Sequence, residues 1–307
     1  MRIKLCGLVA CAAMLVAGLV SCQQEEIPQS LQYPILFGYS DTRAVADLDD
    51  LKDNGFKVYA YFKGNTGNSA TFEKEVTYDE DANVWGYEGL EYWIPGVEYW
   101  FKAFYPVSLE GVGSYGVTNT NSSQNLTISE FNITKQVDIM VASATAKVPE
   151  GASYPAGDNG SVVPLKFQHL LACVDIKIKS AISGITINKV TIGNADNLGE
   201  YSNDEWTSTS SDDIEVDSNK ALTVGDDFVS VVGDGVLVIP ASPAGKYLAV
   251  EASNGKTYEV DFPSTVDWEK GKKYSYTLEI KQSNIVFSEP KVDEWDSENA
   301  TGSVIIK

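Results

Sequence analysis

Apolar and polar residues alternate with a period of two over much of the chain. In residues 56–63 (FKVYAYFK), phenylalanine, valine and alanine alternate with lysine and tyrosine, and in 174–179 (VDIKIK) apolar and charged residues alternate strictly. Successive side chains of a β-strand point to opposite faces, so both stretches predict strands with one buried face. The same reasoning predicts further strands at residues 72–78, 99–106, 138–142, 162–167, 228–232, 236–239, 246–251, 257–262, 274–280 and 285–287.

The segments between these strands are rich in glycine, proline, asparagine and serine, as turns are. We expect loops at 41–54, 114–132 and 193–219, and a β-bulge where apolar residues are oddly spaced at 185–192. No convincing helical stripe interrupts the pattern, which therefore predicts an all-β fold of antiparallel β-sandwiches. A Pro- and Gly-containing stretch at 148–160 has no period. It predicts a boundary between an N-terminal sandwich (44–160) and a C-terminal sandwich (161–307).

An almost unbroken apolar run, residues 33–39, precedes this pattern. It predicts a strand buried on both faces, with Ile35, Leu36, Phe37 and Tyr39 filling a groove in the N-terminal sandwich. The polar segment that follows contains Arg43, which is the only arginine after the leader described below. Arg43 is either an ordinary loop residue or a processing site, with cleavage between Arg43 and Ala44. We favour the second interpretation, since exposed polar loops are where proteases cut.

The first 21 residues have the character of an export signal. Arg2 and Lys4 precede an apolar stretch at 5–20, which is shorter than the roughly 20 residues that span a bilayer. The alternatives are a plain secretory signal or a transmembrane anchor. However, Leu19-Val20-Ser21-Cys22 resembles the lipobox of bacterial lipoproteins, in which the cysteine is acylated. We therefore expect a signal peptide (1–21), a membrane-tethering lipid on Cys22, and a removable tether and first strand (22–43).

The charge and the cysteine count narrow the possible partners. A formal net charge of −20 disfavours binding to nucleic acid and to anionic lipid head groups. Of four cysteines, Cys6 and Cys11 leave with the leader and Cys22 carries lipid, so Cys173 remains alone and no intramolecular disulfide is expected. The aliphatic neighbours of Cys173 predict a buried thiol.

Catalytic and metal-binding signals are weak. His169 is the single histidine, which limits His-based triads and zinc sites to one member, and no phosphate loop or dinucleotide motif is present. Paired acids such as Asp212-Asp213 lack a calcium-loop pattern. We expect no metal, no cofactor and no enzymatic activity. A group of aromatic residues allows two interpretations. We favour buried core residues, and the rival interpretation is an exposed surface that stacks on saccharides. The residues are Trp85, Tyr87, Tyr92, Trp93, Tyr99 and Trp100.

Several short sequence segments together resemble those of the fimbrillin family of Bacteroidota. They are the apolar strand followed by Asp-Thr-Arg-Ala (41–44), YWIPG (92–96), FKAFYP (101–106), LKFQH (165–169), WEKGKKY (268–274) and the region around Trp295. The resemblance implies two transthyretin-like domains and export as an outer-membrane lipoprotein. It also implies cleavage by an arginine-specific protease and assembly with other fimbrial subunits into an adhesive fimbrium by strand exchange. It does not predict the adhesion ligand.

Strand exchange also has a physical basis. A sandwich without one core strand exposes apolar side chains and unpaired backbone groups, which bind another chain's strand. The candidate donor is Val304, Ile305 and Ile306, within 303–306, with 285–287 as an earlier possibility. The alternative is that 304–306 pairs within its own domain. For the whole protein, the alternatives to a stalk or tip subunit are a permanently anchored base subunit and a surface glycan-binding lipoprotein.

Overall fold

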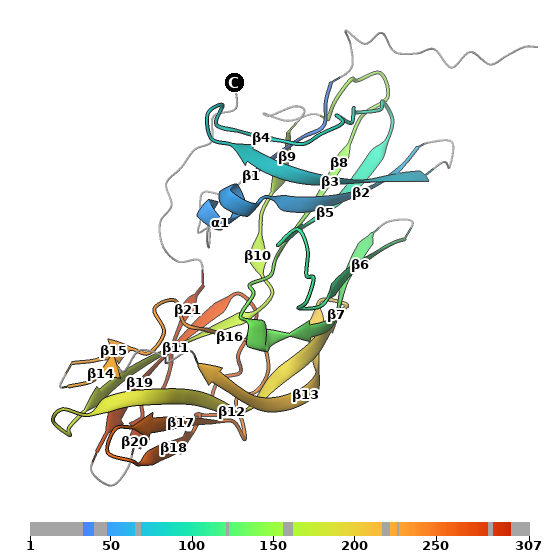
Figure 1. The fold of residues 1–307 in the computed structure, drawn as a ribbon. Helices are drawn as coiled ribbons and strands as arrows, with labels where there is room; N and C mark the ends of the chain where they lie inside the picture. Colours follow the sequence, from blue (N-terminus) through green and yellow to red (C-terminus); the bar gives the residue numbers. More distant parts are fainter. Residues whose placement is uncertain are drawn as a thin grey trace, which may run out of the picture. The chain divides into compact units, whose positions relative to one another are not determined.

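The computed structural model describes residues 33–39, 48–64, 69–120, 123–155, 162–216, 222–225, 227–281 and 285–295. Within these ranges the chain is almost entirely β, as predicted (Figure 1). The helical segments described are α1 (Leu48–Asn54) and the short 3-10 helix η2 (Ile133–Lys135). No helix in the described part is long and apolar enough to cross a membrane.

Strands between residues 36 and 169 form a six-stranded sheet and a small second layer. The sheet has the order β10 (Gln168–His169), β8 (Met140–Lys147), β5 (Glu98–Tyr105), β2 (Phe56–Lys63), β3 (Ser69–Asp79), β4 (Val84–Gly86). The second layer is a two-stranded sheet of β1 (Leu36–Tyr39) and β9 (Val162–Leu165). Side chains of both layers form one buried apolar cluster, which includes Phe37, Val58, Phe101 and Leu165.

Two further sheets contain the strands from residue 172 onward, together with the earlier hairpin β6–β7. One has the order β15 (Val229–Ser230), β11 (Ala172–Ser180), β19 (Lys272–Ile280), β20 (Ile285–Phe287), with β16 (Val236–Val238) also on β11 and β21 (Lys291–Glu294) also on β19. The other has the order β18 (Thr257–Asp261), β17 (Tyr247–Ala252), β12 (Thr186–Ser202), β7 (Gln124–Asn132), β6 (Ser114–Asn119), with β13 (Glu205–Val216) and β14 (Leu222–Thr223) also on β12. Their inner faces share a second apolar cluster.

Strands with a clear period of two lie where the sequence places them. In β2, Phe56, Val58 and Ala60 are buried, while Lys57 and Tyr59 are half-buried on the other face. The bounds of β20 agree with the predicted 285–287. The bulge predicted in 185–192 is confirmed, because the pairing of β12 with β17 shifts register between Ile187 and Lys189.

The predicted loop at 41–54 is wrong at its end, where α1 forms. Leu51 of α1 is fully buried, and the Gly55 N–H donates to the Leu51 carbonyl at 2.8 Å. Gly55 has a φ of +70°, the left-handed conformation that commonly ends helices. A helix this short is stabilised by packing of a single leucine against the core. One apolar residue does not produce a helical period in the sequence, so the helix was not predicted.

The two longer predicted loops are also wrong. Residues 114–132 contain the hairpin β6–β7, and 193–219 contain most of β12 and β13. Leu126 and Ile128 of β7 are buried, whereas Asn125 and Ser129 are exposed. β7 pairs antiparallel with β12, so a hairpin from the first half of the chain extends a sheet of the second half. The predicted boundary at 160 stays a prediction, and this pairing crosses it.

Two ladders are parallel, although antiparallel pairing was expected throughout. β1 is parallel to β9, and β11 is parallel to β19 over eight residue pairs, from Cys173–Lys273 to Ser180–Ile280. Parallel neighbours need a long connection between them. Their partners are therefore distant in the sequence and local patterns do not identify them.

Candidate functional site

The predicted first strand lies inside the fold, between two other segments. On one side, β1 runs parallel to β9, with Phe37 opposite Val163 and Tyr39 opposite Leu165. The backbone of β9 therefore pairs along the length of β1. We call the space that residues 33–39 occupy the first-strand slot.

The opposite edge of the slot is formed by residues 91–93. The Ile35 N–H donates to the Glu91 carbonyl at 2.8 Å, and the Trp93 N–H donates to the Tyr33 carbonyl at 3.0 Å. The Tyr87 hydroxyl donates to the Ile35 carbonyl at 2.6 Å. Residues 33–35 are therefore hydrogen-bonded to the segment around residue 91, and residues 36–39 to β9 in a two-stranded sheet.

The side chains of the first strand are part of the core. Ile35 and Phe37 are 0 % and 2 % exposed, and Leu36 is half-buried. The Phe37 ring lies 5.6 Å from that of Tyr87 and 5.5 Å from that of Phe101, measured between centroids. Burial of a large apolar side chain stabilises a fold by about 1.5–3 kcal/mol. Removal of this strand would therefore expose a substantial apolar surface.

The walls of the slot were not predicted as site residues. They comprise the buried side chains of Trp93, Phe101, Val163 and Leu165. The phrases at 92–96 and 101–106 and the apolar run at 162–167 mark these regions in the sequence. The sequence does not predict which of these segments flank residues 33–39, because pairing between distant strands leaves no local pattern.

The predicted lipidation site Cys22, the cleavage residues Arg43 and Ala44, and the donor residues Val304, Ile305 and Ile306 lie outside the described residues, so their roles stay predictions. Along the chain, Arg43 falls between the end of β1 and the start of α1. The described chain ends at Trp295, whose N–H donates to the Gly271 carbonyl at 3.0 Å.

His169 and Cys173 are structural. The His169 side chain is buried, its Nδ1 lies 2.7 Å from a carboxylate oxygen of Asp138, and its ring stacks on the Trp295 indole at 3.7 Å. Burial raises the pKa of the Cys173 thiol to about 12, so it is protonated at neutral pH, and it donates to the Asp234 carbonyl. Among the described residues, no group of three or more potential ligands is placed to hold a metal ion.

The aromatic cluster near residue 90 is mainly core. Trp85, Trp93 and Tyr99 are at most 7 % exposed, so the hypothesis that these three stack on saccharides is wrong. Trp100 is half-buried, and its ring lies 5.4 Å from that of Tyr61 on the neighbouring strand β2. Such cross-strand aromatic pairs stabilise sheets.

These features define a β-sandwich protein whose first described strand is part of its apolar core. The chain belongs to the fimbrillin-like family, whose model matches residues 42–295. This is a family of structural and adhesion proteins and not of enzymes.

Solved structures agree with this fold. A fimbrial protein from Bacteroides vulgatus is 17 % identical, with a TM-score of 0.60 over 85 % of this chain and 99 % of that one. A protein from Bacteroides uniformis described as a cell adhesion protein is 19 % identical, with a TM-score of 0.56 over 88 % of this chain and all of that one. At these identities the similarity establishes the fold alone. No curated protein sequence matches the chain significantly.

Proposed function

We propose that this chain is the precursor of a structural pilus subunit, which is exported as a lipoprotein, cleaved after Arg43 and polymerised by strand exchange. The observation that carries the proposal is the seating of residues 33–39. Ile35 and Phe37 are buried core residues; residues 36–39 pair with β9, and residues 33–35 are hydrogen-bonded to the segment around residue 91. This strand immediately precedes the segment that contains Arg43 in the sequence.

Cleavage between Arg43 and Ala44 would leave the first strand bound only by non-covalent contacts. It would separate the strand, together with the lipid on Cys22, from the rest of the chain. Departure of the strand would leave the backbone of β9 unpaired and expose Phe101 and Trp93. Unpaired strand edges beside apolar side chains bind another extended segment.

A second copy, or a related fimbrial subunit, would supply that segment. The proposed donor residues are Val304, Ile305 and Ile306, which repeat the aliphatic character of Ile35 and Leu36. Burial of each large side chain contributes about 1.5–3 kcal/mol and each backbone hydrogen bond about 0.5–1.5 kcal/mol. Residues 296–303 separate the donor from Trp295, and an extended chain of that length reaches about 30 Å.

The proposed order of steps implies the partners of the protein and its location in the cell. Before cleavage, the lipid on Cys22 holds the protein at the outer membrane. An arginine-specific protease is the processing partner, and other fimbrial subunits are the assembly partners. After cleavage the subunit is part of a fimbrium on the cell surface. The built-in first strand keeps the slot filled until then, which prevents premature association.

The test is limited digestion of the purified chain with an arginine-specific protease. We expect a product that begins at Ala44, identified by mass spectrometry, followed by a ladder of oligomers on gel filtration. Arg43→Lys should block the cut and keep the chain monomeric at the same unfolding midpoint. A chain cut after Arg43 that loses residues 33–39 and stays monomeric would contradict the proposal. So would oligomers that still form after deletion of residues 303–307.

A further inference from the structure

The two-stranded sheet of β1 and β9 is apolar on its outer face as well as on the face that packs in the core. Phe37 and its partner Val163 point inward, and each is 2 % exposed. Successive side chains of a strand alternate between its faces, so Leu36 and its partner Val162 point outward. Both of these outward side chains are half-buried, which leaves part of each in contact with solvent.

The segment on the other side of the first strand extends this face. Pro34 and Tyr92 are directly paired, so their side chains lie on one face. Leu90 and Ile94 lie two residues before and two residues after Tyr92 and share its face, and they are 49 % and 44 % exposed. We call the following side chains the outer apolar face: Pro34, Leu36, Leu90, Tyr92, Ile94 and Val162.

Exposed large apolar side chains are concentrated around this face. The described part of the chain has eight of them, and four lie here, namely Tyr33, Leu90, Ile94 and Tyr154. The rings of Tyr33 and Tyr154 are in contact, with centroids 4.7 Å apart. Exposed apolar side chains that are contiguous mark a surface that binds another molecule.

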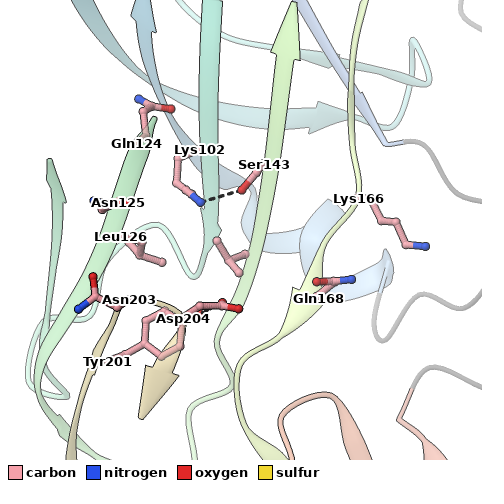
Figure 2. Close-up of a pocket in the computed structure, with 11 residues that line it drawn as sticks. Lys102, Gln124, Asn125, Leu126, Ser143, Lys166, Gln168, Tyr201, Asn203 and Asp204 are labelled. Carbon is pink, nitrogen blue, oxygen red and sulfur yellow. Dashed lines mark hydrogen bonds between the residues drawn. The ribbon is translucent and has the colours of Figure 1, made fainter. Parts of the chain in front are cut away.

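A cavity of about 560 Å³ elsewhere in the fold has the opposite character. Lys102, Gln124 and Asp204 are among its lining residues, and Lys102 Nζ donates to Ser143 Oγ at 2.7 Å (Figure 2). The cavity shares no lining residue with the outer apolar face. The outer apolar face is therefore a separate surface, and none of its six side chains carries a charge.

The position of this face along the chain indicates what covers it. Cys22, the proposed lipid site, is eleven residues before Tyr33, and an extended chain of that length reaches about 40 Å. Tyr33 itself adjoins the face, since its carbonyl accepts a hydrogen bond from the Trp93 N–H at 3.0 Å. A bilayer that holds the lipid is therefore within reach of the face. The net charge of −20 disfavours anionic head groups, so this bilayer surface is zwitterionic.

We infer that the outer apolar face docks the uncleaved precursor on a bilayer of zwitterionic phospholipids. This inference rests on the proposed lipidation of Cys22. Leu90 and Ile94 enter the bilayer beneath the head groups, and the rings of Tyr33 and Tyr154 lie at the interface, where an apolar ring with a polar tip is favoured. The lipid holds the chain at the membrane, and the outer apolar face sets its orientation there.

Cleavage after Arg43 would also dismantle this surface. Pro34 and Leu36 precede Arg43 in the sequence, so they would leave with the first strand and with the lipid. Docking is thus a property of the precursor alone. The same cut would end both the covalent attachment to the bilayer and the apolar contact with it.

The test attaches the chain that begins at Cys22 to phosphatidylcholine vesicles, by coupling its Cys22 thiol to a maleimide-bearing phospholipid. Cys173 is buried, and burial raises the pKa of its thiol to about 12, so it does not compete for the maleimide. This coupling takes the place of acylation, so the result does not depend on whether cells acylate Cys22. Mass spectrometry of the chain isolated from membranes tests acylation separately, and an unmodified Cys22 would contradict the proposed function while the vesicle result stands.

An added tryptophan reports which surface meets the bilayer. Leu90→Trp places an indole in the outer apolar face, and brominated phosphatidylcholine quenches tryptophans that contact its acyl chains. We expect the bromolipid to remove most of the fluorescence that Leu90→Trp adds to the parent. Val266→Trp is the matched control at a position that is 38 % exposed, and its added fluorescence should be unaffected.

A second substitution tests whether the apolar face causes the contact. Ile94→Asp, combined with Leu90→Trp, should abolish most of the quenching, because a carboxylate is strongly disfavoured among acyl chains. Val292→Asp is the matched control, since Val292 is 40 % exposed, and it should leave the quenching of Leu90→Trp unchanged. All four positions are at least 38 % exposed, so the variants should keep the unfolding midpoint of the parent.

Three outcomes would overturn the inference. The first is quenching of Leu90→Trp that is absent or no greater than that of Val266→Trp. The second is quenching of Leu90→Trp that persists unchanged when Ile94→Asp is added. The third is self-association of the unattached chain that Ile94→Asp abolishes, observed by analytical ultracentrifugation, which would identify a second copy as the molecule that covers this face.

Discussion

The ring of Phe37 meets the ring of Phe101 edge-on, with centroids 5.5 Å apart and planes at 77°. Phe37 belongs to β1 and Phe101 to β5, so this contact joins the small two-stranded layer to the six-stranded sheet. Edge-to-face pairs of this kind contribute beyond simple burial. The first strand is therefore held by side-chain packing as well as by its backbone hydrogen bonds.

Phe37→Ala should lower the free energy of unfolding of the uncleaved chain by about 3–5 kcal/mol, because it leaves a cavity against Phe101 and Tyr87. Guanidinium chloride denaturation followed by tryptophan fluorescence measures this change. Leu36→Ala is the matched control on the same strand, and its effect should be smaller since Leu36 is only half-buried. Equal effects of the two variants would argue against the packing described for β1.

Tyr276→Phe should destabilise the second half of the chain by about 1–3 kcal/mol. The Trp268 indole N–H donates to the Tyr276 hydroxyl at 3.0 Å, and both side chains are at most 2 % exposed. Loss of that hydroxyl leaves a buried N–H without its acceptor. Thermal unfolding by calorimetry measures the effect. Tyr154→Phe removes an exposed hydroxyl and should leave the midpoint unchanged, whereas equal shifts would contradict the buried hydrogen bond.

Asp204→Asn should reduce stability at neutral pH but not in acid. The hydrogen bond from Lys270, followed by that from Tyr201, lowers the pKa of Asp204 in the folded protein. Its stabilising contribution is therefore present above the unfolded pKa, about 3.9, and is lost as the pH falls through the lower folded value. Asparagine also tolerates the positive φ of +69° at this turn position.

Unfolding midpoints of the parent and of Asp204→Asn at pH 7 and at about pH 2 measure this effect, since the lower pH is below the unfolded pKa of an aspartate and the stabilising contribution declines there. We expect a difference at pH 7 that shrinks in acid. Asp261→Asn, an exposed change at the end of β18, is the control and should alter the midpoint little at either pH. A difference between parent and Asp204→Asn that grows as the pH falls would contradict the assigned ion pair.

The strands that could be predicted are those whose burial follows the two-residue period. β2 and β11 alternate apolar residues with charged residues or tyrosine in the sequence, and both form as expected, although Tyr61 and Asp175 are also buried. Stretches such as β13 could not be predicted, because most of its side chains are exposed on both faces. Its strand conformation depends on hydrogen bonds to β12, which leave no hydrophobic pattern.

Only the first strand of the candidate site could be predicted from the sequence, and the segments that flank it could not. Ile35, Leu36 and Phe37 are conspicuous because three large apolar residues stand together beside polar segments. Their neighbours Trp93 and Val163 are also apolar, but the same is true of many strands in this chain. Which strands pair depends on chain closure over long distances, which a local pattern does not encode.

The sequence by itself determined that the chain is β-rich and acidic and has an apolar strand at residues 33–39, because side-chain alternation and charge are local properties. Only the tertiary structure decided that β1 lies parallel to β9, that β6 and β7 extend the sheet of β12, and that Lys102 and Gln124 line one cavity. Burial is encoded residue by residue. Backbone hydrogen-bond partners, in contrast, are chosen by the whole fold, since every buried N–H and C=O must find one.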